Sequence, residues 1–214
     1  VTRATVTKGV TAPDGSSNAS SIIPDSSNNT HRLDAFTTTG GSGTGSGLMT
    51  TGETYTASIY AKAYGYNFMS LTLDETTNNP VSLNVVFNLS TGVIESSGAS
   101  ILSSTMEDVG DGWYRCSITK AFTMSTNPWS NRVLIGVMTS STIISYAGDT
   151  SSGILCWGAQ LEKSTSLTGY LPTTSASLSG LTTVTRGANG TTAASASSGD
   201  SIQQLPYALG SLDL

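Results

Sequence analysis

The sequence predicts an all-β protein in which an antiparallel β-sandwich is followed by an extended C-terminal tail. Charged residues make up only 11% of the 214 residues, whereas about a quarter is usual in soluble domains. The polar surface must therefore come from Ser, Thr, Asn and Gly, which favour strands and turns. Short stretches of alternating apolar and polar residues are separated by turn residues, as in a sandwich. No stretch has the period of a convincing amphipathic helix.

Short strands are expected in the first part of the chain, before a glycine-rich loop. Residues 1–8 (VTRATVTK) alternate and predict an opening strand. Pro13-Asp14-Gly15 predicts a turn, because Asp bonds to its own backbone and Gly accepts a positive φ. Two more short strands are expected at residues 20–23 and 31–36. Residues 37–47 (TTTGGSGTGSG) have no side chains from which to build a core, and they predict a flexible loop.

The strongest strand signal lies at residues 55–63 (YTASIYAKA). Alternation places one set of side chains on a single face of this strand: Tyr55, Ala57, Ile59, Ala61 and Ala63. Residues 74–80 predict a polar turn, and residues 88–92 predict a hairpin turn. The other strands expected in this part of the chain are residues 68–73, 81–89, 93–95 and 101–109.

A second run of strands follows the turn at Asp111-Gly112. Residues 113–122 alternate and place Tyr114, Cys116 and Ile118 on one face. Residues 154–162 (ILCWGAQLE) predict another strong strand, with a common face formed by Leu155, Trp157, Ala159 and Leu161. Apolar strands are also expected at residues 132–139 and 142–146. The first part of the chain thus predicts about ten strands.

The composition changes after Leu171-Pro172. Residues 173–201 are dominated by Thr, Ser, Ala and Gly and cannot bury enough apolar area to order as an independent core. Residues 202–214 regain Leu, Pro and Tyr, which is typical of a peptide that docks on a neighbour. We therefore expect two parts, a sandwich at residues 1–172 and a linker with a docking peptide at residues 173–214.

Charge and hydropathy argue against several classes of partner. The net charge is −5, and no cluster of Lys and Arg is present. A protein that binds nucleic acids or anionic membrane surfaces needs such clusters. No apolar run approaches the roughly 18 residues that would span a bilayer. We find no signal peptide. The chain opens on Val1 rather than Met, so we expect a fragment or a processed product.

The two cysteines, Cys116 and Cys156, both lie in strand-like runs. Folds built on disulfides are smaller and much richer in cysteine, so we expect two buried free thiols. A bridge between neighbouring strands is the alternative. A zinc site is not expected, because no cysteine pair is closely spaced and the single histidine, His31, is far away in the sequence.

Several segments together resemble a module found in phage structural proteins, above all in tail fibres. Residues 55–63, residues 107–119 (EDVGDGWYRCSIT) and residues 153–162 carry most of this resemblance. The smaller matching pieces are Pro13-Asp14-Gly15 with Ala19, His31, residues 170–174 (YLPTT) and Val184-Thr185-Arg186. In this order the segments cover about residues 1–188, and the similarity does not extend to the low-complexity sequence after Asn189.

The resemblance implies a jelly-roll sandwich similar to carbohydrate-binding modules and lectin-like domains, and it implies no catalysis. The expected protein is a tail-fibre or spike domain of the virion that contacts host-surface glycan and is assembled in the host cytoplasm. A capsid decoration or tail-assembly protein with a purely structural role is the alternative. An oligomer is expected, with a trimer implied for a fibre. Val1-Thr2-Arg3-Ala4 also echoes Val184-Thr185-Arg186-Gly187-Ala188, which fits a tandem arrangement of modules.

Candidate catalytic groups are sparse, and we expect no enzyme. His31 stands in a polar strand, and no Gly-x-Ser-x-Gly elbow is present, so we interpret it as a surface or packing residue. The carboxylate pairs Asp74-Glu75 and Glu107-Asp108 are adjacent in sequence. Adjacent side chains on a strand point to opposite faces, and neither pair can therefore converge on a glycosidic bond.

A calcium site is more plausible than a catalytic site. Asp14, Asp34 and Asp149 are expected in loops or at strand ends, where carboxylates and backbone carbonyls can bind Ca²⁺. Turn formation is the simpler interpretation of these residues, and we expect no other cofactor.

Sugar binding needs exposed aromatic rings next to polar groups. Trp129 in the loop of residues 127–131 (NPWSN) is the first candidate, and Tyr64 and Tyr66 in the turn AYGYN follow. If it binds no sugar, Trp129 anchors its loop or contacts another subunit. Trp113 and Trp157 are expected in the core, because their neighbours alternate like those of buried strands.

Overall fold

The computed structural model describes residues 3–37, 49–74, 83–123 and 132–172. Within these ranges the chain forms thirteen strands and no helix, which confirms the prediction of an all-β protein. The described residues accordingly contain no helix that could cross a membrane. The predicted tail at residues 173–214 and nearly all of the predicted glycine-rich loop lie outside the described ranges.

Two antiparallel sheets and one short ribbon contain all of these strands. The six-stranded sheet has the order β1 (Ala4–Val10), β2 (Ala19–Pro24), β13 (Gly153–Glu162), β5 (Thr54–Tyr64), β10 (Trp113–Ala121) and β9 (Ile101–Gly110). The five-stranded sheet has the order β4 (His31–Thr37), β11 (Arg132–Met138), β6 (Phe68–Asp74), β7 (Val85–Asn88) and β8 (Val93–Ser97). The ribbon pairs β3 (Asn28–Asn29) with β12 (Tyr146–Ala147).

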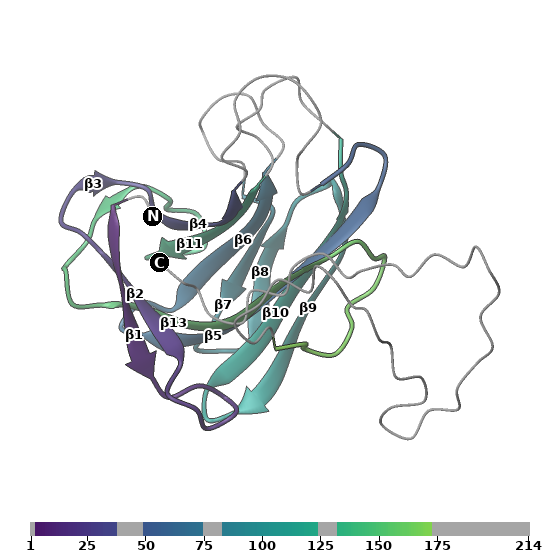
Figure 1. Cartoon of the computed structure of the whole chain (residues 1–214). Helices are drawn as coiled ribbons and strands as arrows, with labels where there is room; N and C mark the ends of the chain where they lie inside the picture. The colour runs from purple at the N-terminus through teal and green to yellow at the C-terminus, as the bar shows by residue number, and fades with distance from the viewer. Residues whose placement is uncertain (1–2, 38–48, 75–82, 124–131, 173–214) are drawn as a thin grey trace.

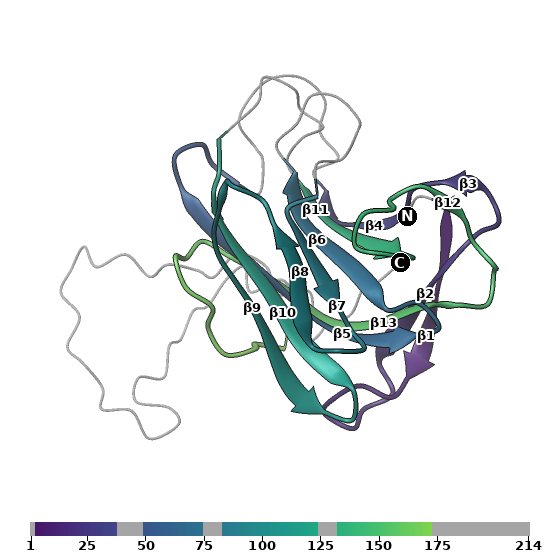
Figure 2. The ribbon, with the colours of Figure 1, turned by 180° about the vertical axis from the view of Figure 1, so that it is seen from behind.

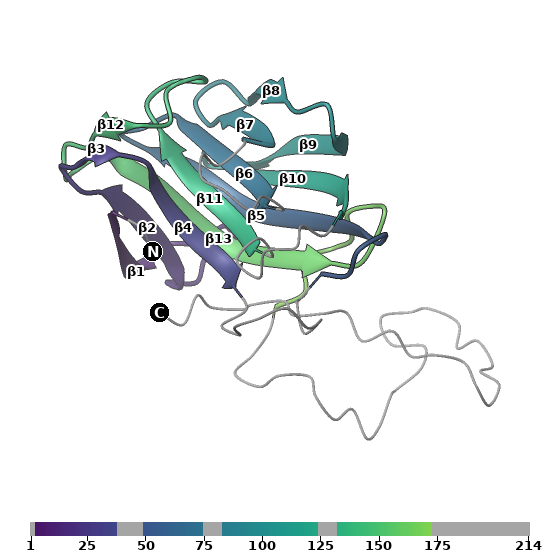
Figure 3. The same ribbon diagram turned by 90° about the horizontal axis from the view of Figure 1, so that it is seen from above.

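The two sheets pack face to face and enclose the hydrophobic core (Figures 1 and 3). Seen from above, β11, β6 and β7 lie over β13, β5 and β10. The six-stranded sheet contributes mostly small and β-branched inward side chains, among them Ala57, Ile59, Ala61, Cys116, Ile118, Ile154 and Cys156. The five-stranded sheet contributes larger ones, among them Leu33, Met69, Leu71, Leu73, Phe87, Val133, Ile135 and Val137. The faces predicted for residues 55–63 and for residues 113–122 are confirmed, because the side chains assigned to each face lie in the core cluster or pack against it.

Strand β13 changes faces partway along, so the single face predicted for it is wrong. Ala159 and Leu161 point into the core, whereas Leu155 and Trp157 belong to a second apolar cluster on the outer face. The cause is a β-bulge: the register with β5 shifts between Trp157 and Gln160. Gly158 takes a φ of +61° inside this bulge, a conformation that glycine adopts without steric cost.

The strand predicted at residues 142–146 is also wrong, except at Tyr146, where β12 begins. The hydroxyl of Ser140 accepts hydrogen bonds from the backbone N–H groups of Thr142 (3.4 Å) and Ile143 (3.1 Å). Side-chain hydrogen bonds of this kind occupy backbone N–H groups that would otherwise bond to a neighbouring strand. The segment therefore forms a local turn, which apolar pattern alone does not indicate.

The prediction of a strand at residues 81–89 includes residues 81–82, which lie outside the described ranges. Among the residues that the structure describes, the strand is shorter than predicted, and β7 begins at Val85. Asn84 stands just before it, and the Asn84 side chain accepts a hydrogen bond from the backbone N–H of Leu73 at 2.8 Å. The backbone N–H of Asn84 in turn donates to the hydroxyl of Thr72 at 3.3 Å. These side-chain bonds connect the end of β6 to the approach to β7.

Both cysteines are free and buried, which confirms the interpretation made from the sequence. Cys116 on β10 and Cys156 on β13 flank the central strand β5, where their register partners are Ile59 and Ala61. Burial among apolar side chains disfavours the thiolate and raises the pKa of both thiols. The two residues therefore act as small apolar core residues.

Candidate functional site

A row of four large side chains crosses the outer face of the six-stranded sheet. Trp157 on β13 is the register partner of Tyr60 on β5. Tyr60 is also paired with Arg115 on β10, and Arg115 with Glu107 on β9. Inward side chains such as Ile59 and Cys116 alternate with these residues, so all four lie on the face away from the core. We call Trp157, Tyr60, Arg115 and Glu107 the outer row; Figure 2 shows strands β9 and β10, which carry half of it.

Aromatic rings gather at one end of the outer row. The ring centroid of Trp157 lies 5.1 Å from that of Tyr60 and 4.6 Å from that of Tyr170. Tyr170 and Tyr60 meet edge to face at 5.8 Å. All three rings are partly exposed, and Tyr60 and Trp157 pack against buried apolar neighbours on the same face that include Trp113 and Leu155. The rings form one supported cluster rather than isolated side chains.

Tyr170 reaches this cluster because residues 163–172, here called the strap, fold back over the outer face of β13 and β5. The side chain of Gln160 accepts a hydrogen bond from the backbone N–H of Leu171 at 2.9 Å and donates to the carbonyl of Gly169 at 3.3 Å. Glu162 accepts hydrogen bonds from the hydroxyl and the backbone N–H of Thr168. Gln160 and Glu162 are fully buried, so the strap is tied down by polar groups shielded from water.

The bulge at Gly158 sets the distance between the strap and the sheet. A Cβ atom added at Gly158 would lie 3.0 Å from the Tyr60 ring and 3.1 Å from the Tyr170 ring. The missing side chain thus leaves room for the two tyrosines to approach each other over the bulge. The same bulge turns Trp157 outward, so one local irregularity in β13 builds much of the aromatic cluster.

The loop between β1 and β2 borders the cluster. The indole N–H of Trp157 donates to the side-chain oxygen of Asn18 at 2.7 Å. Asp14 begins the same loop as a turn residue that accepts the backbone N–H of Ser16 at 2.9 Å. Burial raises the pKa of Tyr170, and the negative charge of Asp14 adds to this effect. This loop therefore contributes an amide and a carboxylate to the edge of the site.

Arg115 occupies the centre of the outer row. Its guanidinium lies 5.5 Å from the centroid of the Tyr60 ring, a cation–π arrangement. Nη2 donates to the hydroxyl of Ser58 over a long distance of 3.4 Å, while Nε is buried and has no hydrogen-bond partner. Burial raises the pKa of Tyr60, with the positive charge of Arg115 acting in the opposite direction.

Beyond the outer row, the same face carries mainly hydroxyl and amide side chains. One parallel row consists of Gln160, Ser58, Ser117 and Thr105, and the next of Glu162, Thr56, Thr119 and Ser103. Hydroxyls pair across strands, Thr56 with Thr119 at 2.9 Å and Thr105 with Ser117 at 2.7 Å. Six of these eight side chains are buried, and the two exposed ones are Thr105 and Ser103 on the edge strand β9. Exposed aromatic rings and exposed polar side chains on one face are the combination that sugar recognition uses, since sugar rings present both apolar faces and hydroxyl groups.

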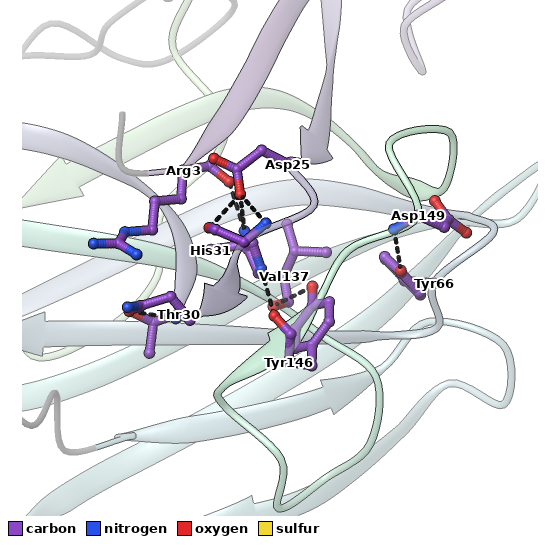
Figure 4. Close-up of polar contacts among 10 residues, drawn as sticks. Arg3, Asp25, Thr30, His31, Tyr66, Val137, Tyr146 and Asp149 are labelled. Atoms are coloured by element: carbon purple, nitrogen blue, oxygen red, sulfur yellow. Dashed lines mark hydrogen bonds and ion pairs between the residues drawn. The ribbon is translucent and has the colours of Figure 1, made fainter.

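A separate polar junction surrounds His31 where β4 begins (Figure 4). The His31 ring is fully buried, and its Nδ1 and Nε2 atoms lie 2.5 and 2.9 Å from the backbone carbonyl oxygens of Arg3 and Tyr146. Asp25 lies 3.7 Å from Nδ1. Hydrogen bonds from Ser27 lower the pKa of Asp25, and His31 has a smaller effect in the same direction.

The rest of this junction is aromatic. The Tyr146 ring packs against the rings of His31 (4.7 Å) and Tyr66 (5.5 Å). The Tyr146 hydroxyl donates to the carbonyl of Val137 at 3.0 Å, and burial raises the pKa of Tyr146. Of the two interpretations of His31, surface or packing, the structure shows packing: the ring on β4 contacts Arg3, just before β1, and Tyr146 on β12, and both ring nitrogens contact backbone carbonyl oxygens.

The aromatic residues predicted to bind sugar are not brought together among the described residues. Trp129 lies outside them. Tyr64 is 51% exposed at the end of β5, whereas Tyr66 packs on Tyr146 and accepts the backbone N–H of Asp149 with its hydroxyl. Trp157, which the sequence places in the core, is instead partly exposed on the outer face. A lone glycine inside a strand is the signal that could have revealed the bulge and this change of face.

The three candidate calcium ligands lie apart, each with its own partners. Asp14 and Asp149 are exposed turn residues, and Asp149 accepts the backbone N–H groups of Ser151 and Ser152. Hydrogen bonds, led by those from Ser152, lower the pKa of Asp149. Asp34 on β4 pairs with Arg32 at 3.2 Å and with Arg132 at 3.7 Å. In the described part of the chain, no three His, Cys, Asp or Glu side chains form a group that could hold a metal ion.

Comparison with protein-family models and with curated proteins finds no match to this chain.

Proposed function

We propose that this chain is a non-enzymatic structural domain of a bacteriophage particle, a tail-fibre or spike domain that contacts host-surface glycan with the outer face of its six-stranded sheet. The segments that resemble phage modules support the virion assignment, and the all-antiparallel sandwich is compatible with the jelly roll that such modules have. We also propose a trimer, with residues 173–214 docking on a neighbouring chain.

The observation that carries the glycan proposal is the outer row together with Tyr170. Trp157 and Tyr170 form a ring pair at 4.6 Å that stays partly exposed. An exposed aromatic pair on the surface of a folded domain loses little conformational entropy on binding and offers a large apolar contact. Asn18 is exposed beside Trp157, and Glu107 is exposed at the opposite end of the outer row, where their polar atoms can bond to sugar hydroxyls. A site of this kind binds through non-covalent contacts and needs no catalytic group.

A purely structural role in the capsid or in tail assembly is the second candidate, and the edge strand β9 favours it. Leu102 on β9 is 63% exposed, and Val109 on the same strand is also exposed. β9 ends the six-stranded sheet, and an edge strand with exposed apolar side chains is a natural contact for another chain. This surface lies on the same sheet as the glycan site, so one particle could use both.

Binding to bacterial cells and to immobilised bacterial polysaccharides tests the proposal. We expect the wild-type protein to bind and Trp157→Ala to lose affinity at least about tenfold, as is usual when an aromatic anchor is truncated. Ile143→Ala is the matched control, because Ile143 is exposed in a loop outside the site. Tyr170→Ala provides a second variant that leaves the sheet itself intact.

The two candidates give different results in this experiment. If the domain contacts the host, Trp157→Ala lowers the affinity for cells and polysaccharide. Leu102→Ala then has no effect on binding to cells. If no wild-type binding is found, but Leu102→Ala disrupts association with other particle proteins, the structural candidate is correct. Electron cryomicroscopy of the particle would then locate the domain on the capsid or within the tail.

A further inference from the structure

We infer that the glycan bound at the outer face carries a carboxylate, and that Arg115 is the residue that binds it. This inference depends on the proposed glycan-binding function and specifies its ligand as an acidic sugar. It rests on the contrast between the burial of the Arg115 guanidinium and the small number of its contacts.

Arg115 is only 7% exposed, yet none of the carboxylates in the described ranges lies within ion-pair distance of it. The guanidinium has five N–H donors, and its contacts are the long bond to Ser58 and the ring of Tyr60. Nε is buried without a partner. A buried cation with unused donors is costly to hold, unless an anion completes its environment.

A carboxylate is the group that fits the unused donors best. The planar guanidinium fork matches a carboxylate in a two-pronged arrangement, which is stronger and more specific than a bond to a neutral hydroxyl. The ring of Tyr60 fixes the guanidinium from one side, so the fork is oriented before the ligand arrives. Preorganisation of this kind lowers the entropy cost of binding.

The spacing within the outer row lets a sugar stack on the aromatic rings while its carboxylate reaches Arg115. Tyr60 and Arg115 are direct register partners on neighbouring strands, which are about 4.8 Å apart. This distance is comparable to the width of one pyranose ring. A sugar stacked on Trp157 and Tyr60 therefore brings a substituent on its ring edge over Arg115, as the carboxylate of a uronic acid requires.

The neighbouring charges set the strength of this interaction. Glu107 is the register partner of Arg115 on its other side and is exposed, and Asp14 borders the cluster at Tyr170. Both carboxylates repel an anionic ligand through solvent. Rotation of Glu107 toward Arg115 is the rival way to neutralise the cation, and it would make the ligand's carboxylate unnecessary. The two explanations differ in the ligand-free protein: if Glu107 neutralises Arg115, Glu107→Gln leaves the cation without a counter-charge and lowers stability, whereas it otherwise leaves stability unchanged.

The experiment uses bacterial exopolysaccharides that contain uronic acid, together with the same polymers after chemical reduction of their carboxyl groups to alcohols. Binding is measured by biolayer interferometry on the full chain. We expect the wild type to bind the acidic polymers at least tenfold more tightly than the reduced ones, with a preference that weakens as NaCl is raised. Arg115→Gln should abolish the preference and retain binding to the reduced polymers, and Glu107→Gln should strengthen binding to the acidic polymers.

Arg115→Lys keeps the charge but lacks the fork, and we expect it to retain only part of the preference. It also provides a folded comparison if Arg115→Gln is unstable in thermal unfolding. Equal wild-type affinity for acidic and reduced polymers overturns this inference and leaves the glycan proposal standing. Weaker binding of the acidic polymers to Glu107→Gln also overturns it. If the wild type binds no polymer in either form, both the proposed function and this inference are contradicted.

Discussion

Raising the pH from 8 to 10 should destabilise this protein through its two buried thiols. Cys116 and Cys156 are completely enclosed by the core, and burial raises the pKa of both above its value in the unfolded chain. The unfolded thiols ionise near pH 8.5. Above that pH the unfolded state releases protons that the folded state keeps, so the stabilising contribution is intact below about 8.5 and falls as the pH rises.

The size of the effect follows from the difference in bound protons. Once the pH exceeds the unfolded pKa, each thiol lowers the free energy of unfolding by about 1.4 kcal/mol per pH unit. At pH 10 this gives about 2 kcal/mol for each thiol and about 4 kcal/mol for the pair. That is a large share of the 5–15 kcal/mol that is typical of single domains.

Urea unfolding at pH 7, 8.5 and 10, with a reductant that prevents disulfide formation, measures this effect. The control is the double variant Cys116→Ala and Cys156→Ala, which keeps the fold and removes both titrating groups. The tyrosines, including Tyr146, titrate alike in both proteins and cancel in the comparison. We expect the wild type to lose about 4 kcal/mol more than the control between pH 7 and 10. A difference below about 1 kcal/mol would mean that the thiols are hydrated or ionised in the folded protein, and the reasoning would be wrong.

Three other changes test particular contacts in the structure. Gly158→Ala forces a side chain into a left-handed conformation against the Tyr60 ring, and we expect a loss of about 1–2 kcal/mol in chemical unfolding; unchanged stability would argue against the bulge. His31→Ala removes a buried ring together with its contacts to the carbonyl oxygens of Arg3 and Tyr146 and should cost about 2–4 kcal/mol, whereas a shift within error would mean that water replaces the ring. The lowered pKa of Asp149 stabilises the fold above the unfolded value of about 3.9 and ceases to do so as the pH falls below it. Asp149→Asn should therefore reduce the fall in unfolding free energy at acidic pH, and an unchanged fall would contradict this.

Alternation along single strands predicted much of the fold. At residues 55–63 and 113–122, period-two patterning identified both the strands and their buried faces, because one face of each strand has to meet the core. The pattern did not predict the structure where local hydrogen bonds replace the hydrogen bonds between strands. Ser140 holds residues 142–143 in a turn, and the ribbon strand β3 has only two residues, too few to show a period.

The candidate site was harder to predict, because it depends on register between strands. Sequence alone marks Tyr60 and Arg115 as outward residues of two strands, but it does not show that they are direct partners. Trp157 was assigned to the core because a regular strand would carry it on the same face as Leu161, and the bulge at Gly158 breaks that regularity. The strap adds Tyr170 from a segment that has no strand pattern at all. Pairing, bulges and returning segments are tertiary features, which short-range patterns do not encode.

Chemical-shift changes at the tryptophan indoles measure most directly whether glycan binds to the outer face. The chain has three tryptophans: Trp157 in the outer row, Trp113 beside it with 4% exposure, and Trp129 in the loop predicted to bind sugar. Bacterial surface polysaccharide is titrated into protein labelled with ¹⁵N at the indole nitrogens. We expect a saturable shift of the Trp157 signal, because its indole N–H bonds to Asn18 at the edge of the site, together with a small change at Trp113. A saturable shift confined to Trp129, or saturable binding that leaves Trp157 unchanged, would contradict the account.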